Sequence, residues 1–480
     1  MPSYKLSHYN HFLRAKDGRY LVYNAIGHGL ARVDEDIYRL LLRGEKGIDE
    51  LARLPDADTK IEFLKSGNII VDSDLDELLL LRTRMNMNRF GNRTLALTIV
   101  PTLGCNLRCV YCYESERSSE VMSEDTCSAI VDFVEKQIDA CGFNSVMVYW
   151  FGGEPLLCLG AIRTLSTGLM KMCKKKKATY NAMAVTNGTI LNRKIARTLK
   201  SLNVRNLQIT IDGLKETHDR RRPFQSGTKS SFDTIVRNID RTLGMLPFQI
   251  RINVDRTNVT ESMALIDVLR EKGWFDKPEY GSFYLGFTRV WTATCSGIES
   301  TCLSIKEFSE AELDFHKDLM KRGFTLSNLY PNQFTYCSAA SPRAFIIDPR
   351  GELYKCWADV GNKEAYFGNV GDEITFNSEL LQWVSWDPLL TDKDCKACTY
   401  FPICGGGCPY VPLRNKSEMN NRCTTWKQLM KEKMELFLKQ RERMMAERDR
   451  QEKEAKEQEA ERKHVEAAVP AEEEVAAATR

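Results

Sequence analysis

The chain has 480 residues, of which 43% are hydrophobic and 28% are charged, and its formal net charge is +3. This length favours two or three domains, and the composition is typical of a soluble globular protein. The near-neutral charge argues against binding to nucleic acid or to an anionic membrane surface.

The sequence contains no N-terminal signal core, and no run approaches the roughly 18 apolar residues of a membrane span. We therefore expect a cytoplasmic protein without a membrane partner. In a reducing compartment, its 16 cysteines indicate metal binding or catalysis rather than disulfide bonds.

Residues 1–90 contain no cysteine and predict a small winged-helix-like module. The apolar pattern predicts strands at Tyr20–Tyr23, Leu30–Val33 and Ile69–Val71 and helices at Asp36–Leu42, Ile48–Leu54 and Ile61–Leu64. We expect this module to bind an extended peptide along a strand edge, a common use of exposed sheet edges. The alternative is a domain that only packs against the rest of the chain.

Residues 91–325 alternate between strand-like apolar runs and amphipathic helical patterns. We expect strands at Leu95–Val100, Ser145–Trp150, Asn181–Val185, Leu207–Ile211, Gln249–Val254 and Phe283–Phe287, and helices at Ser123–Ala140, Gly160–Lys174, Arg193–Leu202, Ser231–Leu243 and Glu261–Gly273. Such alternation predicts an α/β fold with a mainly parallel sheet. Because sites in α/β barrels lie at the carboxyl ends of strands, the loops after these strands are the candidates for a functional site.

The first of these loops, residues 104–113, reads G-C-N-L-R-C-V-Y-C-Y and places Cys105, Cys109 and Cys112 at C-x3-C-x2-C spacing. Cysteine thiolates hold iron–sulfur clusters, and three thiolates leave one iron of a four-iron cluster open. An open metal position indicates chemistry rather than structure. Half of a zinc site, or three small buried hydrophobic residues, would be the simpler alternatives.

With Tyr111 directly before the last cysteine, this loop resembles that of the radical S-adenosylmethionine (radical SAM) superfamily. The resemblance implies a partial (β/α)6 barrel whose [4Fe–4S] cluster is held by Cys105, Cys109 and Cys112. Its open iron would chelate the amino and carboxylate groups of S-adenosylmethionine, and reductive cleavage would leave a 5′-deoxyadenosyl radical.

Motifs after the next three strands extend the resemblance. The second strand ends in Phe151-Gly-Gly-Glu-Pro155, which in the family binds the amino group of S-adenosylmethionine; paired glycines allow close backbone approach. The fourth strand ends in T-I-D-G, which starts at Thr210 and is followed by His218-Asp219 and Arg222, similar to the S-x-D-G…H-D-x-x-R pattern of sulfatase-maturing enzymes. The implied cofactor-binding set is Tyr111, Gly152, Gly153, Glu154, Asn187, Thr210, Asp212 and Arg222.

Four side chains in or near these motifs have individual expected roles. Arg222 suits a carboxylate because its guanidinium binds in a bidentate manner. His218 is expected to be structural rather than a general base. Arg251 and Asn253, on the fifth strand, are expected to line the substrate cavity.

A second cysteine array occupies residues 326–425, and its regular order resembles the SPASM extension of peptide- and protein-modifying radical SAM enzymes. Its seven cysteines are Cys337, Cys356, Cys395, Cys398, Cys404, Cys408 and Cys423, with a predicted hairpin at Arg343–Tyr354. A zinc ribbon would account only for the C-x2-C pair within it.

The resemblance divides the seven cysteines into two auxiliary [4Fe–4S] sites. Cys395, Cys398, Cys404 and Cys423 would ligate the outer cluster. Cys337, Cys356 and Cys408 would ligate the inner one, which then lacks a fourth ligand because residues 328–336 contain no cysteine. Either Cys302 or Cys295 closes this site, or it is open to a substrate thiolate.

The remaining cysteines and the C-terminus have simpler interpretations. Cys127, Cys141, Cys158 and Cys173 lie in helical or loop patterns typical of packing residues. Residues 426–480 predict a long charged helix, Trp426–Glu461, that docks only at its start and continues into a disordered tail.

Together these resemblances imply a radical SAM enzyme with three [4Fe–4S] clusters, S-adenosylmethionine, a precursor peptide or protein as substrate, and a low-potential electron donor such as flavodoxin or ferredoxin. A thioether cross-link in a ribosomally made peptide is the favoured product, with residues 1–90 resembling a leader-recognition domain. Formylglycine formation is the alternative, but sulfatase maturases place an aspartate where this chain has Trp357, and the nearest aspartate is Asp359. Carbon–carbon linkage, or a non-catalytic iron–sulfur protein that binds peptide, also remains open.

Overall fold

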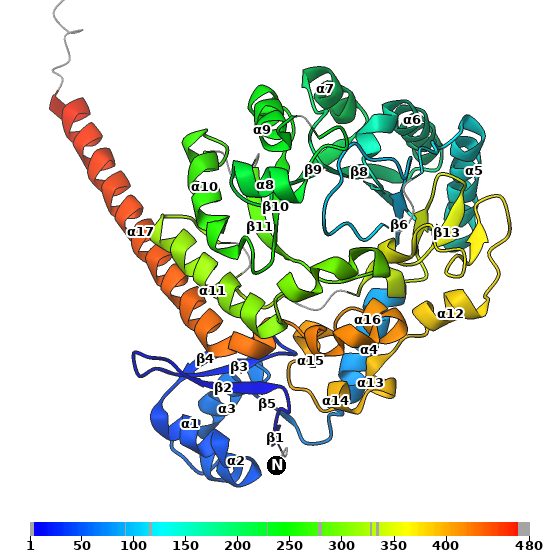
Figure 1. Ribbon diagram of the computed structural model, residues 1–480. Coiled ribbons are helices and arrows are strands. Elements are labelled where there is room, and N and C mark those ends of the chain that lie inside the picture. The colour runs from blue at the N-terminus through cyan, green and yellow to red at the C-terminus, as the bar shows by residue number, and fades with distance from the viewer. Residues whose placement is uncertain are drawn as a thin grey trace, which may run out of the picture.

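The computed structural model describes residues 4–91, 93–114, 118–227, 229–276, 281–326, 329–332 and 336–468. Figure 1 shows an N-terminal module, a large sheet covered by helices, and a long C-terminal helix that leaves the body of the molecule. Residues 469–480, for which we expect a disordered tail, lie outside the described residues.

The N-terminal module contains two small antiparallel sheets and three helices. Strands β1 (Tyr4–Leu6) and β5 (Ile70–Asp72) form one sheet, and β2 (Asn10–Arg14), β3 (Tyr20–Asn24) and β4 (Leu30–Val33) form the other. The helices are α1 (Glu35–Leu42), α2 (Glu45–Leu51) and α3 (Ala57–Ser66). The predicted elements are confirmed within a few residues, whereas β1, β2 and helix α4 (Glu77–Gly91) were not predicted.

The central sheet has nine strands in the order β11-β10-β9-β8-β7-β6-β12-β13-β14. Six of its parallel strands alternate with helices: β6 (Thr94–Ile99), β7 (Ser145–Trp150), β8 (Thr179–Thr186), β9 (Val204–Thr210), β10 (Phe248–Val254) and β11 (Gly281–Phe287). The connecting helices are α5 (Glu124–Cys141), α6 (Leu159–Lys175), α7 (Arg193–Ser201), α8 (Lys215–Arg221), α9 (Ser231–Thr242) and α10 (Ser262–Glu271), with α11 (Ile305–Lys321) after the last strand. The predicted β–α alternation is confirmed.

Short polar side chains cap the N-termini of three of these connecting helices, α5, α7 and α9. Ser123 accepts a hydrogen bond from Thr126 N, Asn192 from Lys194 N and Ile195 N, and Ser230 from Asp233 N. Each such cap satisfies an amide that the helix leaves unpaired, which is worth about 1 kcal/mol. Apolar faces of these helices cover the sheet, and alternate side chains of its strands are buried in one core with them.

The C-terminal region does not form a separate sheet. Strand β12 (Ala344–Ile347) pairs in parallel with β6, and β13 (Glu352–Tyr354) and β14 (Gly368–Asn369) continue the sheet in antiparallel fashion. The predicted hairpin is therefore confirmed, but it extends the barrel sheet at its β6 edge. This pairing places the second cysteine array beside the loop that follows β6.

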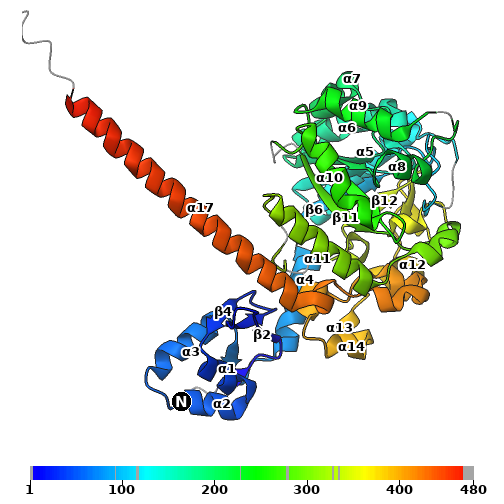
Figure 2. The same cartoon turned by 60° about the vertical axis from the view of Figure 1, so that its left-hand side comes forward.

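Short helices and one long helix complete the chain. The short ones are α12 (Ser378–Val384), α13 (Pro388–Thr391), α14 (Lys393–Lys396), α15 (Phe401–Cys404) and α16 (Tyr410–Arg414). Helix α17 (Trp426–Ala468) docks through Met430, Met434 and Leu438, and Figure 2 shows its remainder extending away from the molecule. The prediction of a helix that docks only at its start is confirmed.

One face of the N-terminal module is covered. Tyr9, Leu13 and Tyr23 belong to a buried cluster that also includes Met85 of α4 and Met434 of α17. In addition, His11 Nε2 lies 3.1 Å from the carbonyl oxygen of Thr399, inside the second cysteine array. The module therefore contacts the C-terminal region rather than the barrel sheet.

Among the described residues, one helical segment, Pro155–Lys175, is long and apolar enough to span a membrane by length and composition. Sequence inspection had found no such run. The segment comprises α6 and the turn before it, and Ile162, Leu165 and Leu169 are fully buried in the main core. Its apolar character is thus explained by packing on the sheet.

Candidate active site

The first cysteine loop lies where β6 ends and is tied to the connection that follows α8. Arg108 N donates to the carbonyl of Pro223 at 2.8 Å, and Val110 N donates to that of Arg221 at 3.0 Å. Cys105, Cys109 and Cys112 are all partly exposed in this loop. The structure thus presents three thiols at the carboxyl edge of the sheet, as the sequence predicted.

Cys105 is the thiol most closely held by the barrel. Its Sγ accepts hydrogen bonds from Leu107 N at 3.4 Å and from Asn187 Nδ2 at 3.8 Å. Burial raises the pKa of Cys105 to about 12, and the neighbouring Cys109 adds to this effect. A bound metal reverses this preference because it holds the thiolate. Amide donors to a cluster sulfur also tune its reduction potential, so the donor set fits an iron–sulfur cluster.

The two glycines after β7 are required by the cysteine loop itself. Gly152 has φ +118°, and a Cβ there would lie 2.5 Å from the carbonyl oxygen of Thr102. A Cβ on Gly153 would lie 2.2 Å from the carbonyl oxygen of Gly104. The glycine pair therefore lets the cysteine loop pack directly on the end of β7. This packing reason accounts for both glycines, besides the contact with a cofactor that the sequence predicted.

Glu154 holds the ends of two strands together. Its fully buried carboxylate accepts hydrogen bonds from Leu156 N at 3.0 Å, Thr186 Oγ1 at 2.7 Å and Asn187 N at 2.7 Å. Burial raises the pKa of this carboxyl, and the three donors oppose the rise. The side chain is committed to these donors, so Glu154 acts as a positioning residue for the loop after β8.

Asn187 connects the loop after β8 to the cysteine loop through hydrogen bonds. Its Nδ2 donates to Asn106 Oδ1 at 2.8 Å, and Asn106 Nδ2 donates to Thr189 Oγ1 at 2.8 Å. Asn187 Oδ1 in turn accepts from Thr189 N at 2.9 Å. The loops after β6, β7 and β8 thus form one hydrogen-bonded unit around Cys105.

The hydroxyl of Tyr111 is the centre of a second network. It donates to Asp212 Oδ2 and accepts from Arg222 Nη1 at 2.6 Å and from Asn253 Nδ2 at 3.0 Å. Asn253 N also donates to Asp212 Oδ1 at 3.1 Å. Residues from β9, β10 and α8 therefore fix the aromatic ring beside the third cysteine. The sequence predicted Tyr111, Asp212 and Arg222 as a set, and the structure brings them into contact.

Arg222 has donor capacity left for a ligand. The side chain is buried, and its Nε forms no hydrogen bond with any described residue. A buried, incompletely paired guanidinium is suited to a carboxylate, which it binds with two parallel hydrogen bonds. Thr210, the last residue of β9, is buried next to this region, as a cofactor contact would require.

His218 is structural, as predicted. Its Nδ1 accepts a hydrogen bond from Asp212 N at 3.2 Å, and the ring is fully buried. Burial lowers the pKa of His218 to about 3, with a further contribution from Arg222. The ring is therefore neutral at physiological pH and is not a proton acceptor for chemistry at the mouth.

The seven cysteines of the second array fall into two neighbourhoods. Burial raises the pKa of Cys356, and the nearby Cys337 and Cys408 reinforce the rise. Burial likewise raises the pKa of Cys404, reinforced by Cys423 and Cys398, and it raises the pKa of Cys395 to about 12, to which Cys404 and Cys398 contribute. Cysteines that the resemblance assigned to the same site thus lie near one another, and their roles as ligands stay a prediction.

The two cysteines suggested as a fourth inner ligand lie in the segment after β11, and besides burial, Cys295 and the inner Cys356 both help to raise the pKa of Tyr410. Cys295 is buried, and its Sγ donates to the carbonyl oxygen of Thr292 at 3.2 Å. Burial raises the pKa of Cys302 to about 11, with smaller contributions from Glu418, Asp255 and Cys295. Within the described part of the chain, no three His, Cys, Asp or Glu side chains converge closely enough to hold a single metal ion.

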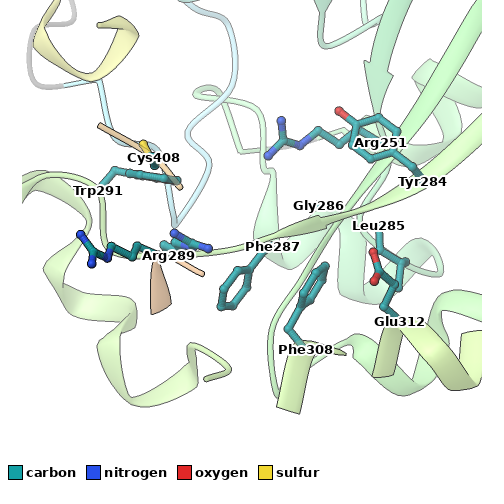
Figure 3. A pocket seen from close by; sticks show the side chains of 11 residues that line it. Arg251, Tyr284, Leu285, Gly286, Phe287, Arg289, Trp291, Phe308, Glu312 and Cys408 are labelled. Carbon is teal, nitrogen blue, oxygen red and sulfur yellow. The ribbon is translucent and has the colours of Figure 1, made fainter. Parts of the chain in front are cut away.

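A pocket of about 410 Å³ opens between β11 and the C-terminal region. Figure 3 shows Arg251 and Tyr284 at one end, Arg289, Trp291 and Cys408 at the other, and Phe287 and Phe308 between them. The sequence predicted Arg251 as a cavity residue. It gave no signal for the aromatic and arginine residues that follow β11, because they belong to no motif.

The position corresponding to the catalytic aspartate of sulfatase maturases is filled by an aromatic contact. The Trp357 ring lies 4.3 Å from that of Phe151, centroid to centroid. Asp359 is buried instead beside Arg414, with 3.7 Å between Oδ2 and Nε. Burial raises the pKa of Asp359 to about 6, and Arg414 opposes the rise. Asp359 thus pairs inside the C-terminal region, and it does not line the pocket.

Comparison with known proteins identifies the domain. Residues 99–254 match the family described as Radical SAM superfamily. The chain is 22% identical over 447 residues to the radical SAM cyclopropyl synthase TigE of Paramaledivibacter caminithermalis, covering 84% of this chain and 89% of that protein. It is 24% identical to a cysteine-type anaerobic sulfatase-maturating enzyme of Clostridium novyi, covering 66% of this chain and 88% of that protein.

A solved structure shares the fold. That of native anSMEcpe with bound AdoMet and the Cp18Cys peptide has a TM-score of 0.58 and 20% sequence identity, covering 72% of this chain and 98% of that one. With two other curated relatives the match is confined to part of the protein, since the chain spans 40% and 46% of their length.

Proposed function

We propose that this chain, whose residues 99–254 match the Radical SAM superfamily, is an enzyme of that superfamily that installs a thioether cross-link in a ribosomally made peptide. A hydrogen atom would be removed from an unactivated C–H bond, the cysteine thiol would lose its proton, and the carbon would be joined to the sulfur. The remaining electron would be taken up by the auxiliary clusters. One observation carries this proposal: Cys408 of the inner set lines the same pocket as Arg251 and Tyr284 of the barrel. A peptide in this pocket would lie between the two cysteine arrays.

The residues at the barrel mouth fit the cofactors that the superfamily implies. Cys105, Cys109 and Cys112 would hold a [4Fe–4S] cluster, and Arg222 would bind the carboxylate of S-adenosylmethionine. Once bound, these cofactors supply the radical chemistry, while the protein binds, orients and excludes water. The network around Tyr111 keeps Arg222 in place, and Arg251 Nε donates to Asn253 Oδ1 at 2.7 Å, which links the network to the pocket.

The second array would hold two further clusters, which makes three in total. We assign Cys395, Cys398, Cys404 and Cys423 to the outer site and Cys337, Cys356 and Cys408 to the inner one. We assign the fourth inner position to a substrate thiol, because the thiol of Cys295 donates to the carbonyl oxygen of Thr292. A soft thiolate is the ligand iron–sulfur clusters prefer, and a sulfur held there would lie close to the reacting carbon.

Two other products are less well supported. Formylglycine formation lacks the expected aspartate, because Trp357 packs on Phe151 and Asp359 pairs with Arg414. A carbon–carbon bond is suggested by the name of one relative, a cyclopropyl synthase. Cys408, which lines the pocket, favours chemistry at sulfur over either of these.

We also assign substrate recognition to the N-terminal module. One face of its three-stranded sheet is buried against the C-terminal region, whereas the outer edge of β4 pairs with none of the described strands. A leader peptide would add to this edge as a further strand. An electron donor of low potential, such as flavodoxin or ferredoxin, would serve the clusters in the cytoplasm.

The cysteine triad provides the test of radical chemistry. Replacing Cys105, Cys109 and Cys112 together by Ala should abolish formation of 5′-deoxyadenosine in the reduced, reconstituted enzyme, while iron of the auxiliary sites is retained because their thiolates are unchanged. Chromatography and iron analysis measure both. Retention of 5′-deoxyadenosine formation in this variant would refute the assignment.

The product is tested with a short cysteine-containing peptide encoded beside the gene. A thioether requires the loss of two hydrogen atoms together with the loss of a thiol that iodoacetamide can alkylate. A carbon–carbon bond would leave the thiol free, and formylglycine would create an aldehyde. Removing the leader should impair modification; equal processing of the leaderless peptide would contradict recognition by the N-terminal module.

A further inference from the structure

The pocket between the barrel and the C-terminal region carries uncompensated positive charge. Glu312, its acidic lining residue, accepts a hydrogen bond from Lys433 Nζ at 2.5 Å. Arg422 is paired with Asp392. Arg251 and Arg289, by contrast, form no ion pair with any of the described residues. The two unpaired arginines lie at opposite ends of the pocket (Figure 3).

Arg289 is held in place by aromatic rings rather than by an acid. Its guanidinium carbon lies 4.4 Å from the centroid of the Phe287 ring and 5.4 Å from that of Trp291. Stacking engages the flat faces of a guanidinium and leaves the N–H groups at its edge available. Glu418 is a nearby acid whose charge acts on Arg289, but its carboxylate accepts from Asn421 Nδ2 at 3.0 Å.

The side chain of Arg251 is likewise held in place by its neighbours, Asn253, Tyr284 and Gly286. Its Nε is engaged by Asn253, and its guanidinium carbon lies 5.9 Å from the Tyr284 ring. A Cβ on Gly286 would lie 2.7 Å from Arg251 Nε, so only glycine lets the side chain lie across β11. The Nη atoms of Arg251 donate no hydrogen bond to the residues that the structure describes.

We propose that this pocket selects a peptide that carries a carboxylate near its reacting cysteine, that Arg289 binds this carboxylate, and that Arg251 adds positive charge at the other end of the pocket. Partly buried guanidinium groups without an acid partner are unfavourable, and an anionic ligand removes that penalty. The carboxylate belongs either to an Asp or Glu side chain or to the C-terminus of the peptide. This inference rests on the proposed peptide substrate and adds the substrate's charge to it.

Probe peptides test the inference without any change to the enzyme. Fluorescein-labelled heptapeptides with a central cysteine and blocked ends would carry either Asp or Asn at one of the flanking positions. Fluorescence polarisation with the anaerobically reconstituted full-length enzyme should show about tenfold tighter binding of the best Asp peptide than of its Asn counterpart. An otherwise Asn-containing peptide with a free C-terminus distinguishes the second source of the carboxylate. Equal binding of all charged and neutral peptides would overturn the inference.

Variants then locate the effect. Arg289→Gln should abolish the preference for a carboxylate, and Arg289→Lys should retain part of it because the charge remains without the bidentate geometry. Circular dichroism confirms folding of both. Arg270→Gln is the matched control: Arg270 also stacks on a ring, at 5.3 Å from Phe324, but lies outside the pocket. It should leave the preference intact.

A preference for Asp that survives in Arg289→Gln and in Arg251→Gln would show that the arginines serve another purpose, such as compensating the charge of Cys408. Failure of the proposed function would look different. In that case 5′-deoxyadenosine would form without modification of any peptide, whatever its charge.

Discussion

The two cysteine arrays of this protein are built in different ways. The first is a contiguous loop of eight residues, from Cys105 to Cys112, whose surroundings are hydrogen-bonded to the ends of five parallel strands. The second spans 87 residues, from Cys337 to Cys423, over short helices and turns. The first array is thus positioned by the barrel, whereas the second depends on long-range anchors. Damage to each should have different consequences.

The largest effect is expected where the first array touches β7. Gly153→Ala would place a Cβ against the carbonyl of Gly104, and the cysteine loop must move. A displacement of about 1 Å near a reacting centre can reduce the rate about 100-fold, so we expect at least this loss in 5′-deoxyadenosine formation. Gly160→Ala, in α6, meets nothing within 4 Å and should be neutral. Equal effects of the two changes would contradict the packing role of the glycine pair.

The second array is anchored to α4 through Arg89, and we expect it to be destabilised when this anchor is removed. Buried Arg89 donates to the carbonyl oxygens of Ala340 at 2.8 Å, Trp386 at 3.1 Å and two further residues. Arg89→Met leaves these acceptors unpaired, and we expect a loss of at least about 3 kcal/mol in unfolding free energy. Auxiliary iron should fall while 5′-deoxyadenosine formation persists.

The same helix supplies the control for this prediction. Arg82 pairs with Asp387 at 3.1 Å, but its side chain is 41% exposed. Arg82→Met should therefore cost no more than about 1 kcal/mol. Denaturant unfolding under anaerobic conditions measures both variants, and a similar loss in each would mean that burial of Arg89 is not what anchors the array.

A smaller effect, on the pH dependence of stability, is expected from His218. The pKa of His218 is lowered to about 3 in the folded protein, so the unfolded state binds the proton more readily. Its contribution therefore makes stability fall as the pH decreases from about 6.5 toward 3, by up to about 1.4 kcal/mol per pH unit. His218→Asn retains an acceptor for Asp212 N and should flatten this slope. An unchanged slope would mean that other groups cause the acid sensitivity.

The sequence predicted the first array well because its signals are local. The cysteine spacing, the glycine pair and the strand ends all occur within short segments, and each parallel strand brings its terminal loop to the same edge. The sequence predicted Glu154 as a cofactor-binding residue, whereas its side chain accepts hydrogen bonds from three donors at the ends of β7 and β8. Such a role depends on which strands are neighbours.

The pocket was largely beyond sequence-based prediction. Its lining residues range from Arg251 to Arg422 and come from β10, β11, α11 and the C-terminal region. Stacking of Arg289 on Phe287 and Trp291 requires a bend in the chain after β11, and no sequence motif predicts this bend. The composition of the segment shows the residue types but not their convergence.

The pairing of β12 with β6 has a consequence for biosynthesis. The outer edge of β6 finds its partner only when residues 344–347 have been made, 245 positions after Ile99. At typical translation rates of about 5 to 20 residues per second, the outer edge of β6 therefore stays unpaired for about 12 to 50 seconds during synthesis. An unpaired edge strand is a template for aggregation. Slower initiation or a lower growth temperature should therefore improve the soluble yield of the full-length chain more than that of a protein whose sheet closes locally.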